Sequence, residues 1–131
     1  MVETNGRNFD LLTLGQVLLR LSPPDNERLS RGDTFVKQVG GAELNVAVGA
    51  ALLGLHTGVI SKLPAHDIGS FMKGKIRSFG VSDDFFMYDQ SPAARVGIYY
   101  YENGAYPRKP KVIYDRNHSS FFSLDIDEIP E

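Results

Sequence analysis

The feature that most constrains the fold is an apolar segment, GGAELNVAVGAALLG, which runs from Gly40 to Gly54. Two glycines precede an almost wholly apolar run that contains one asparagine, and one glycine follows it. Glycine readily adopts the left-handed conformation that ends a helix. The segment therefore predicts a helix from Ala42 to Leu53.

Strand patterns alternate with helical patterns along the first two thirds of the chain. Residues 34–39 and 57–64 predict strands, and apolar side chains at helical spacing predict a helix that starts near Asp67 and stops at Gly80. Residues 9–22 are interpreted as a buried strand with a bend at Gly15. This alternation predicts an α/β fold in which helices cover a partly parallel sheet.

Composition excludes several classes of function. The 131 residues suit one domain, and 14 basic against 16 acidic residues give a net charge of -2 without a block of like charge. We therefore expect no nucleic-acid partner and no membrane partner, and a cytoplasmic location. The chain has no cysteine, and its three histidines lack ligand spacing, so we expect no metal site.

Residues 94–116 predict a flap of antiparallel strands. In ARVGIYYYE every second residue shares a face, which groups Arg95, Tyr99 and Tyr101, and KVIYDR groups Tyr114 with Arg116 in the same way. Asparagine, glycine and two prolines between these runs favour a hairpin turn. The tyrosines and arginine on one face could bind a small hydroxylated or carboxylated molecule, or the hairpin could simply pack against the protein.

One motif imitates a phosphate-binding loop. Residues 69–76, GSFMKGKI, match the first part of that motif, but Ile76 stands where a hydroxyl must meet magnesium. Because the apolar residues also fall at helical spacing, we interpret this segment as a helix.

The two glycines and Asn45 point to a ligand at the start of the first helix. Gly40 and Gly41 let the backbone approach a ligand, and the first N–H groups of a helix lack partners. Glu43 would repel a polyphosphate, which favours a sugar. Burying Asn45 unpaired would cost about 1 to 3 kcal/mol, so we expect its amide to bind either a ligand or a nearby backbone group.

These segments together resemble a known family. VGGAELNVAVGAALLGL followed by GVISKLPAHDIGSFMKGKIRSFGV is similar to the N-terminal signature of the PfkB, or ribokinase-like, carbohydrate kinases. LGQVLLRLSPP, ARVGIYYYENGAYPRKPKVIYDR and FSLDIDEIPE narrow the resemblance to 2-keto-3-deoxygluconate kinases. It covers residues 9–131.

The resemblance implies a fold and a lid. Residues 1–131 are expected to form the N-terminal part of a ribokinase-like domain, with flanking helices and a lid whose strands lie at about 16–39 and 94–117. In the family this lid closes over the sugar and often joins two subunits, so a homodimer through the lid strands is expected.

The resemblance also implies a substrate site. The positions that contact the sugar correspond to Gly40, Gly41, Asn45, Tyr99, Tyr114 and Arg116. Arg116 would meet the carboxylate or keto end. One departure bears on the substrate: Arg20 stands where ribokinases and fructokinases usually carry an aspartate, which favours a sugar acid.

The expected activity is phosphorylation of 2-keto-3-deoxygluconate, with ATP and Mg²⁺ as cofactors of the full-length enzyme. The family's Gly-Ala-Gly-Asp loop, which supplies the catalytic base, has no counterpart in this sequence. We therefore expect a fragment that recognises the sugar, binds no cofactor and carries no catalytic residue. The alternatives are a fructokinase or another PfkB sugar kinase, and a non-catalytic module for sugar binding or dimerisation.

Overall fold

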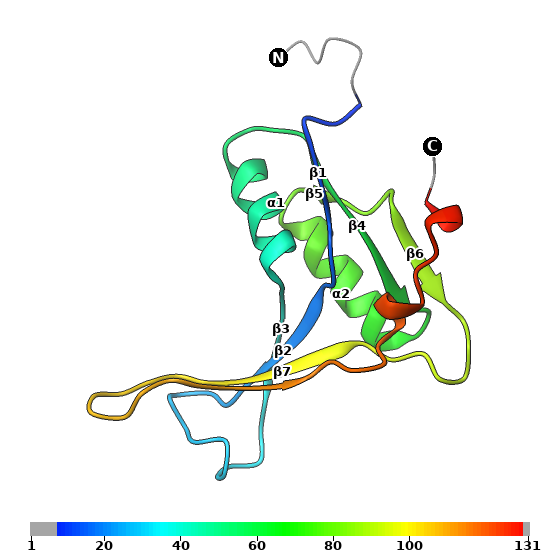
Figure 1. The fold of residues 1–131 in the computed structure, drawn as a ribbon. Helices are drawn as coiled ribbons and strands as arrows, with labels where there is room; N and C mark the ends of the chain where they lie inside the picture. The colour runs from blue at the N-terminus through cyan, green and yellow to red at the C-terminus, as the bar shows by residue number, and fades with distance from the viewer. Residues whose placement is uncertain (1–7, 130–131) are drawn as a thin grey trace.

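A computed structural model describes residues 8–129, which form two four-stranded sheets with two α-helices (Figure 1). The parallel sheet contains β1 (Leu11–Leu14), β4 (Thr57–Pro64), β5 (Val81–Ser82) and β6 (Phe86–Asp89). The mixed sheet contains β2 (Leu18–Ser22), β3 (Val36–Gly40), β7 (Gly97–Glu102) and β8 (Lys111–Asp115). The helices are α1 (Ala42–Leu52) and α2 (Asp67–Ser78), followed near the end by short 3-10 turns η1 (Ser120–Ser123) and η2 (Ile126–Glu128).

Both predicted helices are confirmed within one or two residues. The chain leaves α1 through Leu53 and Gly54, and α2 through Phe79 and Gly80, and both glycines have a positive φ. At the start of α2 the His66 ring nitrogen accepts a hydrogen bond from the Ile68 N–H at 3.2 Å. Glycine therefore ends each helix for the conformational reason that the sequence indicated.

The prediction of one bent strand over residues 9–22 is wrong. β1 and β2 belong to different sheets, and the residues between them carry the chain from one sheet to the other. A Cβ at Gly15 would overlap the side chain of Glu43, and Thr13 Oγ1 donates to the Glu43 carbonyl at 3.1 Å. The glycine therefore lets this crossing pack closely against the start of α1.

One apolar core joins the two helices to both sheets. It buries pairs of residues from α1, β4 and α2 together with single residues of neighbouring strands and segments: Val17, Leu19, Leu44, Ala47, Val59, Leu63, Met72, Ile76, Val81, Phe86 and Val96. This burial is the main source of stability, at about 25 cal/mol per Å² of apolar surface.

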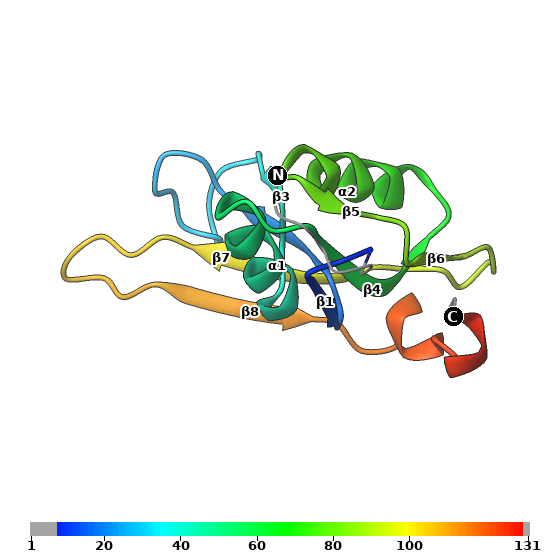
Figure 2. The same ribbon diagram turned by 90° about the horizontal axis from the view of Figure 1, so that it is seen from above.

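The predicted flap is a sheet of two antiparallel hairpins joined by a parallel pair. β3 pairs with β2 and β8 pairs with β7 in antiparallel fashion, whereas β2 and β7 run parallel. The hairpin of β7 and β8 reaches well beyond the helices (Figures 1 and 2). The sequence patterns predicted neither this parallel pair nor the short strands β5 and β6.

The junction of β3 with α1 depends on Gly41. This residue precedes α1 with φ 128° and ψ 141°, a conformation that is largely restricted to glycine. A Cβ there would also lie 2.8 Å from the Gln16 carbonyl oxygen. By contrast, a Cβ on Gly49 in the middle of α1 would have open space around it.

We therefore predict opposite effects for alanine at these two glycines. Gly41→Ala should lower the free energy of unfolding by about 1 to 3 kcal/mol because it adds backbone strain. Gly49→Ala, the matched control, should raise it by about 0.5 to 1 kcal/mol because alanine favours a helix. Urea denaturation followed by circular dichroism measures both, and equal effects would contradict this account of the junction.

A buried leucine and an exposed leucine of α1 and its C-terminal cap give a second prediction. Leu44 is 1% exposed in the core, whereas Leu53 at the end of the helix is 84% exposed. Leu44→Ala should cost about 2 to 5 kcal/mol of unfolding free energy, and Leu53→Ala less than about 0.5 kcal/mol. A loss at Leu53 as large as that at Leu44 would show that α1 packs on a different face.

Candidate functional site

Four polar residues form a row across one face of the mixed sheet. Arg20 of β2 pairs with Gln38 of β3 on one side and with Tyr99 of β7 on the other, and Tyr99 pairs with Tyr114 of β8. Residues that pair directly across neighbouring strands point to the same face. We call Gln38, Arg20, Tyr99 and Tyr114 the polar row.

The next row of paired residues toward α1 contains two glycines. Gly40, Leu18 and Gly97 pair across β3, β2 and β7. A Cβ at Gly40 would overlap the Tyr99 hydroxyl, and a Cβ at Gly97 would lie 3.0 Å from the Arg116 Cβ. The missing side chains therefore let a phenol and an arginine lie close to the sheet beside the start of α1.

Aromatic surface and a cation meet at the edge of this face. The rings of Tyr99 and Tyr114 lie 6.1 Å apart, and the Arg116 guanidinium lies 4.8 Å from the Tyr114 ring centre. Burial raises the pKa of the Tyr99 phenol, although the nearby Arg20 cation opposes the shift. The Tyr99 hydroxyl is therefore protonated at neutral pH and can donate a hydrogen bond.

Asn45 is exposed, so the cost of burying an unpaired amide, from which the sequence predicted a partner, does not apply to it. It lies one turn along α1 from Gly41, whose carbonyl accepts its backbone N–H at 2.9 Å. Within residues 8–129 the Asn45 side chain makes no hydrogen bond, and α1 has no side-chain cap at its start. The Asn45 amide and the first N–H groups of α1 are therefore available to bind an external group.

We call the face of the mixed sheet that carries the polar row the tyrosine face. Arg20, and not the predicted Arg95, lies on it. Arg95, which the strand pattern placed with Tyr99, precedes β7 and forms an ion pair with Asp115 at 3.0 Å. Arg20 instead lies among the tyrosines, with its guanidinium 4.7 Å from the Tyr101 ring centre. Alternation within VLLRLS could have placed Arg20 on a strand face, but not beside β7.

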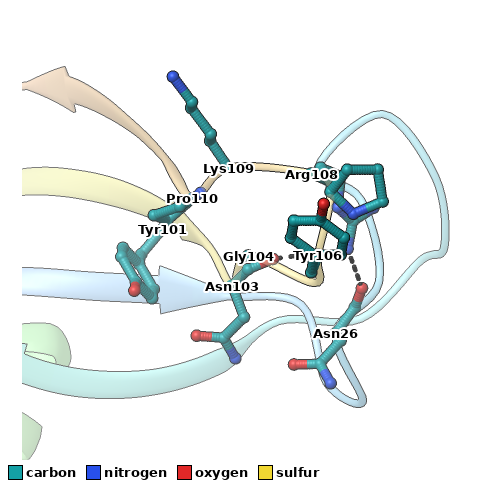
Figure 3. Close-up of a pocket in the computed structure, with 9 residues that line it drawn as sticks. Asn26, Tyr101, Asn103, Gly104, Tyr106, Arg108, Lys109 and Pro110 are labelled. Carbon is teal, nitrogen blue, oxygen red and sulfur yellow. Dashed lines mark hydrogen bonds between the residues drawn. The ribbon is translucent and has the colours of Figure 1, made fainter.

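A cavity of about 570 Å³ lies at the outer end of the β7–β8 hairpin, beyond the polar row (Figure 3). Arg108 lines it and donates to the Asn26 carbonyl at 2.6 Å. Its guanidinium also lies 3.9 Å from the buried Glu102 carboxylate. These polar groups tie the hairpin to the loop between β2 and β3, and none of the predicted site residues lines the cavity.

Residues 69–76 lie within α2, which confirms that the resemblance to a phosphate loop is misleading. A Cβ at Gly69 would overlap the Pro64 carbonyl, so this glycine serves the packing of α2 on β4. Across residues 8–129 there is no cluster of three metal-ligating side chains. Neither helix in that part of the chain is long and apolar enough to cross a membrane.

Comparison with known proteins assigns this chain to a family. The model of the pfkB family carbohydrate kinases matches residues 8–129. The chain is 38% identical over 120 residues to 2-dehydro-3-deoxygalactonokinase of Haloferax volcanii, covering 92% of this chain and 37% of that protein.

Solved structures agree with this relationship. The 2-dehydro-3-deoxygluconokinase of Thermotoga maritima superposes with a TM-score of 0.85 at 39% identity, over 92% of this chain and 36% of that one. An uncharacterized sugar kinase from Pyrococcus horikoshii in complex with ATP shares the fold, with a TM-score of 0.79 at 22% identity over 92% and 38% of the two chains.

The chain thus spans little more than a third of the length of these proteins. The family match covers almost all of its residues, and the order of its strands and helices agrees with the ribokinase-like fold. This chain belongs to the pfkB family of carbohydrate kinases.

Proposed function

We propose that this chain recognises a sugar acid, 2-keto-3-deoxygluconate or a close relative of it, for an ATP-dependent carbohydrate kinase. The observation that carries the proposal is the charge of the tyrosine face. The alternate residues of β2, β3, β7 and β8 on that face include Arg20 and no carboxylate, and Arg116 follows at the end of β8. A face with two cations favours an anionic ligand over a neutral one.

Each predicted residue has a role in this proposal. Gly40 and Gly41 bring backbone and helix N–H groups close to the sugar, and Asn45 exchanges hydrogen bonds with its hydroxyls. Tyr99 and Tyr114 supply apolar ring surface and hydroxyl donors. Arg116 pairs with the carboxylate, because a guanidinium matches the geometry of that group.

Support for the substrate also comes from the relatives. The proteins from Haloferax volcanii and Thermotoga maritima are named for keto-deoxy sugar acids that differ in sugar configuration. The polar row contains no aspartate to accept hydrogen bonds from the hydroxyls of a neutral sugar. We therefore place a sugar acid ahead of fructose as the ligand.

We assign the phosphoryl transfer to parts of a kinase outside residues 8–129. The described residues do not fit a nucleotide, because their phosphate-loop-like segment is helical and the Gly-Ala-Gly-Asp loop is missing from the sequence. In the complete kinase ATP would supply the phosphoryl group, and Mg²⁺ would neutralise its charge. We further propose that the kinase acts in the cytoplasm.

Replacing Arg116 tests the proposed function. Calorimetric titration of the 131-residue chain should detect binding of 2-keto-3-deoxygluconate. Arg116→Met should weaken this binding about tenfold, or about 1.4 kcal/mol, because a charged hydrogen bond is lost. Fructose binding should not change. The matched control is Arg77→Met on α2, which removes an exposed cation outside the mixed sheet. Equal losses for the acid and the neutral sugar would contradict the role of Arg116.

A second prediction concerns catalysis. With ATP, Mg²⁺ and 2-keto-3-deoxygluconate, the 131-residue chain should release no ADP above background in a coupled assay, because it lacks a positioned base. Turnover that depends on the sugar would show that the chain carries the chemistry itself.

We also propose that two copies associate through the lid strands. β8 is an edge strand of the mixed sheet, and Val112 and Ile113 on it are 42% and 49% exposed. An exposed apolar edge strand is suited to pair with another chain.

Ile113→Lys should therefore shift the chain toward the monomer, because a charged side chain blocks edge pairing. Sedimentation equilibrium measures the change, and Leu53→Lys at the exposed end of α1 serves as the control. A dimer that persists in Ile113→Lys and is lost in Leu53→Lys would place the interface on α1.

A further inference from the structure

Arg20, which stands where the resemblance places an aspartate in ribokinases and fructokinases, occupies the centre of the polar row. It pairs with Gln38 on one side and with Tyr99 on the other, so its side chain shares their face of the mixed sheet. Arg116 lies past the end of β8, beyond the Tyr99–Tyr114 ring pair. The two cations therefore flank the same two aromatic rings.

Two neighbours hold the Arg20 guanidinium in place. Its Nε donates to Ser22 Oγ at 3.1 Å, and its central carbon lies 4.7 Å from the Tyr101 ring centre. Ser22 is buried and Tyr101 is half-buried, so both anchors are themselves fixed by packing. An arginine held on an aromatic ring loses little conformational freedom when it binds an anion.

No carboxylate neutralises this cation among residues 8–129. The ion pairs found there involve Lys62, Lys73, Arg77, Arg95 and Arg108. Arg20 instead contacts the Ser22 hydroxyl and the Tyr101 ring, which leaves its terminal N–H groups without an ionic partner. An uncompensated cation on a partly desolvated surface attracts anions more strongly than one in water.

Arg20 is also coupled to the phenol that lies over Gly40. Its positive charge opposes the rise in the pKa of Tyr99 that burial causes, while Tyr114 and Tyr101 add to that rise. The cation partly offsets the effect of burial, so the Tyr99 hydroxyl is a better hydrogen-bond donor than it would be without Arg20, because a more acidic phenol donates a stronger bond.

We propose that Arg20 is a specificity-determining residue, which makes this site prefer a sugar acid to a neutral sugar by placing a second, anchored cation beside Tyr99. This inference rests on the proposed function and deepens it. Arg116 pairs with the acid directly from the edge of the sheet. Arg20 supplies a fixed positive potential from its centre and strengthens the donor that meets the sugar.

The test compares Arg20→Met with the conservative Arg20→Lys in the 131-residue chain. Calorimetry should show that Arg20→Met weakens the binding of 2-keto-3-deoxygluconate about tenfold and the binding of fructose by clearly less, while Arg20→Lys keeps most of the affinity for the acid. The salt dependence of acid binding should be shallower in Arg20→Met than in the parent chain, because one cation has been removed. Arg77→Met is again the control.

Tyrosine titration followed by NMR provides a readout without ligand. Arg20→Met should raise the pKa of Tyr99 further, whereas Arg20→Lys should leave it close to the parent value. If the parent chain binds no sugar acid, the proposed function fails. A higher Tyr99 pKa in Arg20→Met would then still show that Arg20 and Tyr99 interact. If the parent chain binds the acid but Arg20→Met binds it equally well, or loses both sugars equally, the role of Arg20 is wrong and the proposed function stands.

Discussion

The parallel pairing of β2 with β7 is the constraint on which the candidate site depends. It aligns Arg20 with Tyr99 and Leu18 with Gly97, and each strand carries its own hairpin partner into the same sheet. A slip of one residue would turn Arg20 to the opposite face, where Leu19, Leu21 and Ile98 pack against the core. Burial of these apolar side chains therefore fixes the register, and the register in turn positions the polar row.

Close packing at glycines brings the two parts of the site together. Gly41 turns the chain from β3 into α1 and leaves no room for a side chain against the Gln16 carbonyl. Gly40 lets the Tyr99 hydroxyl lie over the backbone just before that turn. The start of α1 and the tyrosines are consequently neighbours, although they are far apart in the sequence. The proposed binding of hydroxyls and a carboxylate at once requires this combination of donors and cations.

Local patterns predicted much of the fold, because helices and hairpins depend on nearby residues. The glycines that end α1 and α2, and the alternation that groups Tyr99 with Tyr101, are visible in single segments. Long-range partners were not visible. Nothing in residues 9–22 shows that β1 and β2 belong to different sheets, or that Arg20 would displace Arg95 from the tyrosine face. Asn45 looked buried because its neighbours in sequence are apolar, yet it faces outward on the helix.

The most direct test of the sugar site is an NMR experiment on the 131-residue chain with 2-keto-3-deoxygluconate. Intermolecular nuclear Overhauser effects report which side chains lie beside the bound sugar. Our account predicts effects from the sugar protons to the Asn45 side-chain amide and to the Tyr99 ring. Effects confined to Tyr106 and the rest of the cavity at the hairpin end would contradict it.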